Sequence, residues 1–118
     1  MTRPGVINYI DNMTVDKVRE QEYQEKLRAE VLMRTNSFAC TIFLFGSRAT
    51  GDIKRSSDFD IGVSGLSERE FSRLKQQLEG IEDDLNLPHS VDIVNFEAAD
   101  KSFAARIERE GVEIWKQS

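Results

Sequence analysis

The sequence predicts an α/β (α+β) fold, a small mixed β-sheet of three to four strands with helices packed on it. Segments whose apolar residues alternate, typical of strands, lie between segments whose apolar residues recur every three to four positions, typical of helices. The linker between the first two strands has about a dozen residues, which is too few for a crossover helix and favours antiparallel pairing.

A single domain is expected, with an N-terminal helical segment over residues 1–36 and a core over residues 37–118. The 118 residues are 39% hydrophobic and 31% charged, which is ordinary for a soluble globular domain. The net charge of −5 argues against a free-standing nucleic-acid-binding protein, because such proteins are usually basic. We expect neither a membrane span nor a secretory signal. The lone Cys40 predicts a buried thiol in a reducing cytoplasm.

Residues 1–36 are predicted to be helical because two groups of apolar residues have helical spacing. These groups are Val6, Ile7, Ile10 and Met13, and then Tyr23, Leu27 and Val31. Thr14 or Asp16 is a possible N-cap between them. We expect this weak apolar stripe to pack on the chain's own sheet, with docking on another protein as the alternative.

Four segments are predicted to be strands. Residues 37–45 are apolar on both faces, which is typical of a central strand. Residues 58–64 form an amphipathic strand, and residues 91–96 form a third strand that is mostly apolar. Residues 112–115 alternate and predict a short edge strand.

Two further helices complete the expected order. Ser67 and Glu70 form a capping box, and helical spacing carries the following helix over residues 71–85, although Gly80 weakens its end. The last helix is expected over residues 100–111, between a capping aspartate and a terminating glycine.

The candidate chemistry lies at the end of the first predicted strand and the start of the second. Asp58 and Asp60 are two positions apart, so they point to one face of the strand. Like charges this close need a counter-charge, and Mg²⁺ prefers carboxylates combined with phosphates and water. Gly46 and Ser47 form a turn that a phosphate can approach, and Arg48 adds a fork of donors. The stretch therefore suggests a metal held beside a phosphate.

Asp92 is a lone acid in the third predicted strand. Both faces of that strand are apolar, which favours a buried acid with a partner over a surface acid on an edge strand. Asp92 would be a third metal ligand if its strand lies beside the second.

Together these motifs resemble the DNA polymerase β-like nucleotidyltransferases. Residues 44–51, LFGSRATG, and residues 57–61, SDFDI, followed by Asp92, are similar to the minimal nucleotidyltransferases, the MNT group. The resemblance implies the polymerase β-like nucleotidyltransferase fold and transfer of a nucleoside monophosphate, AMP from ATP, to an acceptor hydroxyl.

The resemblance also implies roles for individual residues. It assigns nucleotide binding to Gly46, Ser47 and Arg48. The catalytic and metal-binding residues are Asp58, Asp60 and Asp92, which would hold two Mg²⁺ ions, and Asp92 would help to deprotonate the acceptor.

Minimal nucleotidyltransferases often resemble the antitoxin of a toxin–antitoxin pair whose toxin is a HEPN-domain RNase. The resemblance thus implies a cytoplasmic antitoxin that adds AMP to a tyrosine of a HEPN-type partner, in a possible homo- or hetero-oligomer. Two alternatives stay open: a non-catalytic module that neutralises its partner by steric contact, and a nucleotidyltransferase acting on a small molecule.

Overall fold

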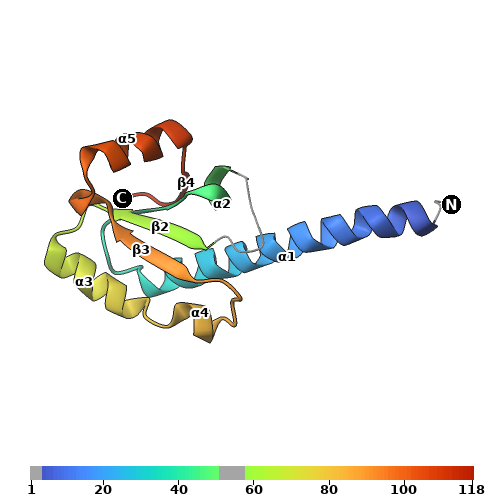
Figure 1. Cartoon of the computed structure of the whole chain (residues 1–118). Coiled ribbons are helices and arrows are strands. Elements are labelled where there is room, and N and C mark those ends of the chain that lie inside the picture. The colour runs from blue at the N-terminus through green and yellow to red at the C-terminus, as the bar shows by residue number, and fades with distance from the viewer. Residues whose placement is uncertain (1–3, 51–57) are drawn as a thin grey trace.

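The computed structural model describes residues 4–50 and 58–118, and for residues 4–16 and Thr50 it describes the backbone alone. A four-stranded sheet with the order β3-β2-β1-β4 forms the centre of the fold (Figure 1). The strands are β1 (Thr41–Phe45), β2 (Phe59–Ser64), β3 (Val91–Asn95) and β4 (Glu113–Lys116). The helices are α1 (Pro4–Arg34), α2 (Ser47–Thr50), α3 (Glu68–Gln77), α4 (Ile81–Asp84), the 3-10 helix η1 (Phe96–Ala98) and α5 (Lys101–Glu110).

The sheet is mixed, as the sequence predicts. Strand β1 pairs antiparallel with both β2 and β4, which confirms the expectation drawn from the short linker. Strand β3 pairs parallel with β2, because α3 and α4 carry the chain back across the sheet between these two strands. The acidic strand β2 therefore lies between β1 and β3.

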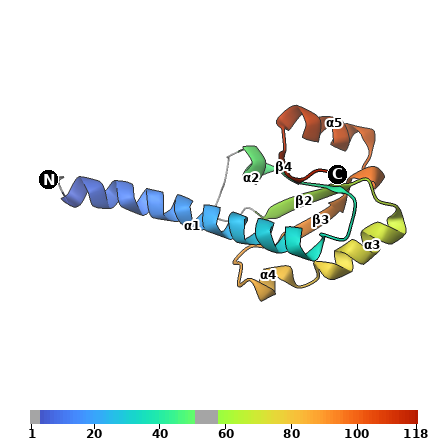
Figure 2. The same ribbon diagram turned by 180° about the vertical axis from the view of Figure 1, so that it is seen from behind.

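Helices cover both faces of the sheet, with α1, α3 and α4 on one side and α5 on the other (Figures 1 and 2). The larger core lies under α1, α3 and α4 and includes Leu27, Leu74 and Ile61, all fully buried. The smaller core lies under α5 and joins Phe43 and Phe45 to Ile107. Strand β1 is buried on both faces as predicted, but it begins at Thr41 rather than at residue 37.

Helix α1 is longer than its core contacts require. It runs without interruption from Pro4 to Arg34, so the prediction of a new helix start at Thr14 or Asp16 is wrong. Leu27 and Val31 are fully buried against the sheet, whereas the N-terminal part of α1 projects beyond the rest of the molecule (Figures 1 and 2). Among the α1 side chains that the structure describes, those in the core come from the C-terminal half of the helix.

The helix predicted over residues 71–85 divides into two. Ser67 and Glu70 form the expected capping box, in which each side chain bonds the other residue's backbone N–H. Helix α3 ends at Gln77, and Gly80 has a φ of 74°, in the left-handed region, before α4 begins. Glycine tolerates that conformation at no steric cost, so the chain turns here instead of continuing the helix.

The C-terminal elements follow the prediction with one change. Strand β3 ends at Asn95, whose side chain accepts a bond from the N–H of Glu97 and starts η1. Asp100 caps α5, and β4 forms the edge strand next to β1. Cys40 is buried and free, as expected. Within the described ranges, none of the helices has the length and apolar character needed to cross a membrane.

Gly62 is required by packing. It pairs with Phe43 across β1 and β2, and a Cβ atom at Gly62 would lie 2.3 Å from the Phe43 ring. The ring thus fills the space that a side chain at position 62 would need, on the same face as Asp60.

Candidate active site

Asp60 and Asp92 are neighbours in the sheet. The parallel register of β2 and β3 pairs Asp60 with Asp92, and the antiparallel register of β1 and β2 pairs Phe45 with Asp60. Directly paired residues project from the same face of a sheet on strands about 4.8 Å apart. The expectation that the third predicted strand lies beside the second is therefore confirmed, and two of the three aspartates share one face.

The electrostatics of Asp60 show that the third aspartate is close as well. Partial burial raises the pKa of Asp60, and the nearby charges of Asp92 and Asp58 raise it further. Arg106 on α5 acts in the opposite direction and lowers it. Asp58 and Asp92 are thus close enough to disfavour the ionised form of Asp60, and a bound cation would offset this repulsion.

The exposure of Asp92 differs from the prediction. The sequence predicts a buried acid because both faces of its strand are apolar, but Asp92 is exposed. The reason is the strand order, since β3 forms an edge of the sheet and one side of it is open. Asp58 is also exposed and directly precedes β2.

Gly46 ends β1 in close contact with Asp60. Its φ of 79° lies in the left-handed region, and a Cβ atom at this position would lie 2.6 Å from Oδ2 of Asp60. Any side chain at position 46 would therefore collide with the carboxylate. Ser47 follows at the start of α2, so the Gly46–Ser47 turn lies directly beside the acidic residues. Residues 51–57, which continue the motif, lie outside the described residues.

The structure gives the Arg48 side chain a role other than the predicted contact with phosphate. The side chain is fully buried, and Nη2 lies 2.7 Å from Oε1 of Glu20 on α1. Its guanidinium carbon lies 4.0 Å from the centre of the Phe59 ring, a stacking geometry that Arg favours. Arg48 therefore joins α2 to α1.

Glu20 is the centre of this junction. Its Oε1 also lies 2.9 Å from Nε2 of His89, which is close to fully buried. Burial alone would raise the pKa of Glu20, but hydrogen bonds from Arg48 and His89 lower it. Glu20, Arg48 and His89 thus fix the position of the Gly46–Ser47 turn relative to α1 and to the start of β3.

Sequence reasoning missed Glu20, His89 and Arg106. Glu20 lies in a stretch of helix that is polar on all sides. The residues that it contacts, Arg48 and His89, are 28 and 69 positions away in the sequence. Neither spacing nor periodicity indicates such contacts. Arg106 lies on the exposed side of an amphipathic helix, where a basic residue is usual.

The residues present fit a divalent metal. Mg²⁺ is held in proteins by a few carboxylates together with substrate phosphates and water, and Asp58, Asp60 and Asp92 supply such carboxylates next to a glycine that allows close approach. Among the described residues, however, no three acidic, histidine or cysteine side chains are already grouped closely enough to hold a metal ion. Phosphate oxygens and water would have to complete the coordination.

Comparison with known families gives a direct match. Residues 21–118 match the family described as "Polymerase beta, Nucleotidyltransferase". The chain belongs to this family. The match begins within α1 and continues to the last residue, so it covers the sheet, the candidate site and Glu20's neighbours on α1.

Solved structures show the same nucleotidyltransferase fold. One, described as a toxin–antitoxin with AMP-PNP, has a TM-score of 0.56 and 21% identity and covers 77% of this chain and 73% of that chain. Another, a mutant of the toxin–antitoxin MntA-HpeT, has a TM-score of 0.55 and 18% identity over the same shares. No curated protein matches the chain.

Proposed function

We propose that this nucleotidyltransferase transfers AMP from ATP to a tyrosine hydroxyl of a HEPN-type toxin and acts as its antitoxin in the cytoplasm. The observation that carries the proposal is the register of Asp60 with Asp92, beside Asp58 and Gly46. A triphosphate needs such a site because its charge must be neutralised while an oxygen attacks the α-phosphorus.

The proposed reaction is a single displacement. The acceptor oxygen bonds to the α-phosphorus of ATP, and the bond from that phosphorus to the oxygen bridging to the β-phosphate breaks. Pyrophosphate leaves, and the acceptor proton passes to the carboxylate of Asp92, which is exposed and therefore accessible to an acceptor. Mg²⁺, two ions in our proposal, would neutralise the phosphates and polarise the attacking and leaving oxygens when bound by Asp58, Asp60 and Asp92.

The Gly46–Ser47 turn is proposed to hold the triphosphate. Gly46 lacks a side chain where it abuts Asp60, so a phosphate can approach both the main chain and the carboxylate. Backbone N–H groups in such turns bind phosphate oxygens. Arg48 acts as a positioning residue here, because its buried ion pair with Glu20 orients the turn.

The choice of ATP and of a protein acceptor rests on the similar structures. One is described as a toxin–antitoxin with AMP-PNP, which is an ATP analogue. The other carries glutamate in place of two aspartates that are two positions apart, the spacing of Asp58 and Asp60. Both observations concern those proteins and support the proposal for this one.

The test incubates the purified chain with Mg²⁺, labelled ATP and the product of the adjacent gene. We expect label on a tyrosine of the partner and release of pyrophosphate. If ATP binds but the partner stays unlabelled, the proposal of protein modification is wrong.

A matched variant separates this function from the alternatives. The double variant Asp58→Asn, Asp60→Asn keeps the shape of the site but removes two charges. If it neutralises the partner as well as the wild type does, the chain acts as a steric binding module. Label on a small molecule in the absence of any protein partner would indicate the other alternative.

A further inference from the structure

Among the strands that the structure describes, none pairs with the outer edge of β3, which lies next to the aspartates. Strand β3 is last in the strand order, and the N–H of Phe59 on β2 donates to the carbonyl oxygen of Ser90 over 2.9 Å. Backbone groups alternate along a strand, so Ser90, Asp92 and Val94 face β2. Val91 and Ile93 therefore direct their N–H and C=O groups away from β2, toward the open side.

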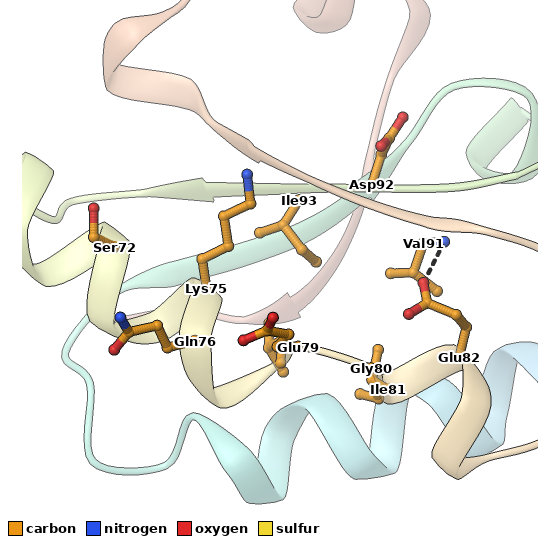
Figure 3. Close-up of a pocket in the computed structure, with 11 residues that line it drawn as sticks. Ser72, Lys75, Gln76, Glu79, Gly80, Ile81, Glu82, Val91, Asp92 and Ile93 are labelled. Atoms are coloured by element: carbon orange, nitrogen blue, oxygen red, sulfur yellow. Dashed lines mark hydrogen bonds between the residues drawn. The ribbon is translucent and has the colours of Figure 1, made fainter.

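At one of these positions a side chain already accepts the hydrogen bond that a neighbouring strand would accept. The N–H of Val91 donates to Oε2 of Glu82 on α4 over 3.1 Å (Figure 3). The carboxylate oxygen occupies the place that the carbonyl of an added strand would take. The edge is thus blocked at Val91, and the next outward-facing residue is Ile93.

A hollow of about 400 Å³ lies along this edge, between β3 and the helices α3 and α4. Figure 3 shows Ile93 pointing into the hollow and Asp92 pointing away from it, toward the opposite face of the sheet. The hollow is lined by the apolar residues Leu78 and Ile81 and by the charged residues Lys75, Glu79 and Glu82. The carboxylates of Glu79 and Glu82 outnumber the single ammonium group of Lys75, and this negative charge disfavours a polyanion. Neither a triphosphate nor a nucleic acid therefore suits the hollow.

We propose that an extended segment of the acceptor protein binds to the outer edge of β3 as an added strand. This inference rests on the function proposed above. Strand addition bonds the segment's backbone to that of Ile93, and its side chains then alternate between the two faces of the sheet. A residue placed beside Asp92 lies on the face of the three aspartates, while its neighbours lie over the hollow.

This arrangement gives the acceptor its position in the reaction. The hydroxyl beside Asp92 bonds to the α-phosphorus, pyrophosphate leaves, and the proton passes to Asp92. The added strand extends the pairing of Asp60 with Asp92 by one position. The acceptor residue, Asp92 and Asp60 then lie in one row across three neighbouring strands.

The test compares Ile93→Pro with Ile93→Ala, using the adjacent-gene product as acceptor. Proline removes the outward N–H, which the sheet does not use, and proline is tolerated on such edges. Alanine removes side-chain atoms but keeps the N–H, so it controls for lost packing. We expect transfer by Ile93→Pro to be about tenfold below that of Ile93→Ala, with ATP binding equal in both.

Equal transfer by the two variants would overturn the docking proposal and leave the proposed function standing. Absence of transfer by the wild type would overturn the proposed function, and the docking proposal with it.

A second measurement needs no variant and covers the case in which Ile93→Pro fails to fold. Amide hydrogen exchange of Ile93, followed by NMR in the wild-type chain, should slow about tenfold when the adjacent-gene product is added. Unchanged exchange would overturn the proposal. Protection that grows with the concentration of the chain alone would show that a second copy covers the edge, and this would overturn it as well.

Discussion

At the scale of single residues, Asp60 combines partial burial with repulsion from two neighbouring carboxylates. Burial and the charges of Asp92 and Asp58 raise its pKa above the ordinary value of 3.8, so its ionised form opposes folding. The same repulsion prepares the site for a cation, because a bound metal removes it. Stability and function therefore compete at this position.

The variant Asp60→Asn should be more stable than the wild type and inactive. Transfer should fall at least about a hundredfold, the scale of losing one electrostatic group in an active site. A group with a raised folded-state pKa stabilises the fold below its unfolded pKa and loses that contribution as the pH rises through the folded pKa. The variant's advantage should thus be absent below pH 3.8 and grow above it.

Thermal unfolding in the presence of a chelator, measured from acid to neutral pH, checks this prediction. Lys75→Gln is a suitable control, since Lys75 is exposed on α3 and away from the aspartates' face. A variant less stable than the wild type at neutral pH would contradict the electrostatic account of Asp60.

Mg²⁺ bound by the aspartates should stabilise the folded wild type, because it removes the repulsion between them. A ligand that binds only the folded state stabilises it, by about 2.7 kcal/mol when its concentration is a hundred times its dissociation constant. We expect Mg²⁺ with AMP-PNP to raise the unfolding temperature of the wild type and to raise that of Asp60→Asn much less. Calorimetric scans with and without the metal measure this, and equal shifts would exclude Asp60 as a ligand.

At the scale of elements, the junction of α1, α2 and the start of β3 depends on Glu20. Arg48 is fully buried and pairs with Glu20, whose side chain is 20% exposed. Removing one partner of a buried ion pair leaves an uncompensated charge, which is more costly than losing the attraction itself. The turn beside Asp60 therefore depends on a residue of another helix.

The variant Glu20→Gln should reduce the free energy of unfolding by about 2 kcal/mol, less than for a wholly buried pair because Glu20 is partly exposed. It should also weaken ATP binding, since the Gly46–Ser47 turn loses its anchor. Glu22→Gln, an exposed change on the same helix, should stay within about 0.5 kcal/mol of the wild type. Equal denaturation midpoints of the two variants would rule out the anchoring role.

Local signals in the sequence were sufficient for most elements. The capping box at Ser67, the continuous apolar run of β1 and the period-two pattern of β2 depend on neighbouring residues, and the structure contains all three elements. Gly80 was recognised as a weak point, but periodicity could not show that the chain turns there, because Leu78 and Ile81 remain buried on both sides of it.

At the scale of the whole molecule, the sequence carried less information about the site. The motif predicts that Asp58, Asp60 and Asp92 form the site, and the structure confirms that the strands of Asp60 and Asp92 are neighbours. The catalytic roles of the aspartates stay a prediction. The exposure of Asp92 depends on strand order, which no local pattern encodes. The Glu20–Arg48 pair joins distant segments for the same reason. The division into residues 1–36 and 37–118 stays a prediction.

The projecting part of α1 should contribute little to global stability. The family match begins at residue 21, and among the α1 side chains that the structure describes, from residue 17 on, the first fully buried one is Leu27. Deleting residues 1–15 should shift the unfolding temperature by less than about 2 °C, whereas Leu27→Ala should cost about 2–5 kcal/mol. A large loss of stability in the shortened chain, seen in thermal scans, would show that the projecting part contacts the core.

Helix α1 is a single rod of 31 residues that holds the proposed triphosphate turn at one point, Glu20. The tip at Pro4 lies about 24 Å from Glu20 along the axis, at 1.5 Å per residue. Because the C-terminal half of α1 packs on the sheet, a small change in the angle of the helix near Arg48 would become a larger displacement of its tip. A dye at the tip of α1 would therefore report, by its distance to Trp115, whether nucleotide binding changes the angle of the helix.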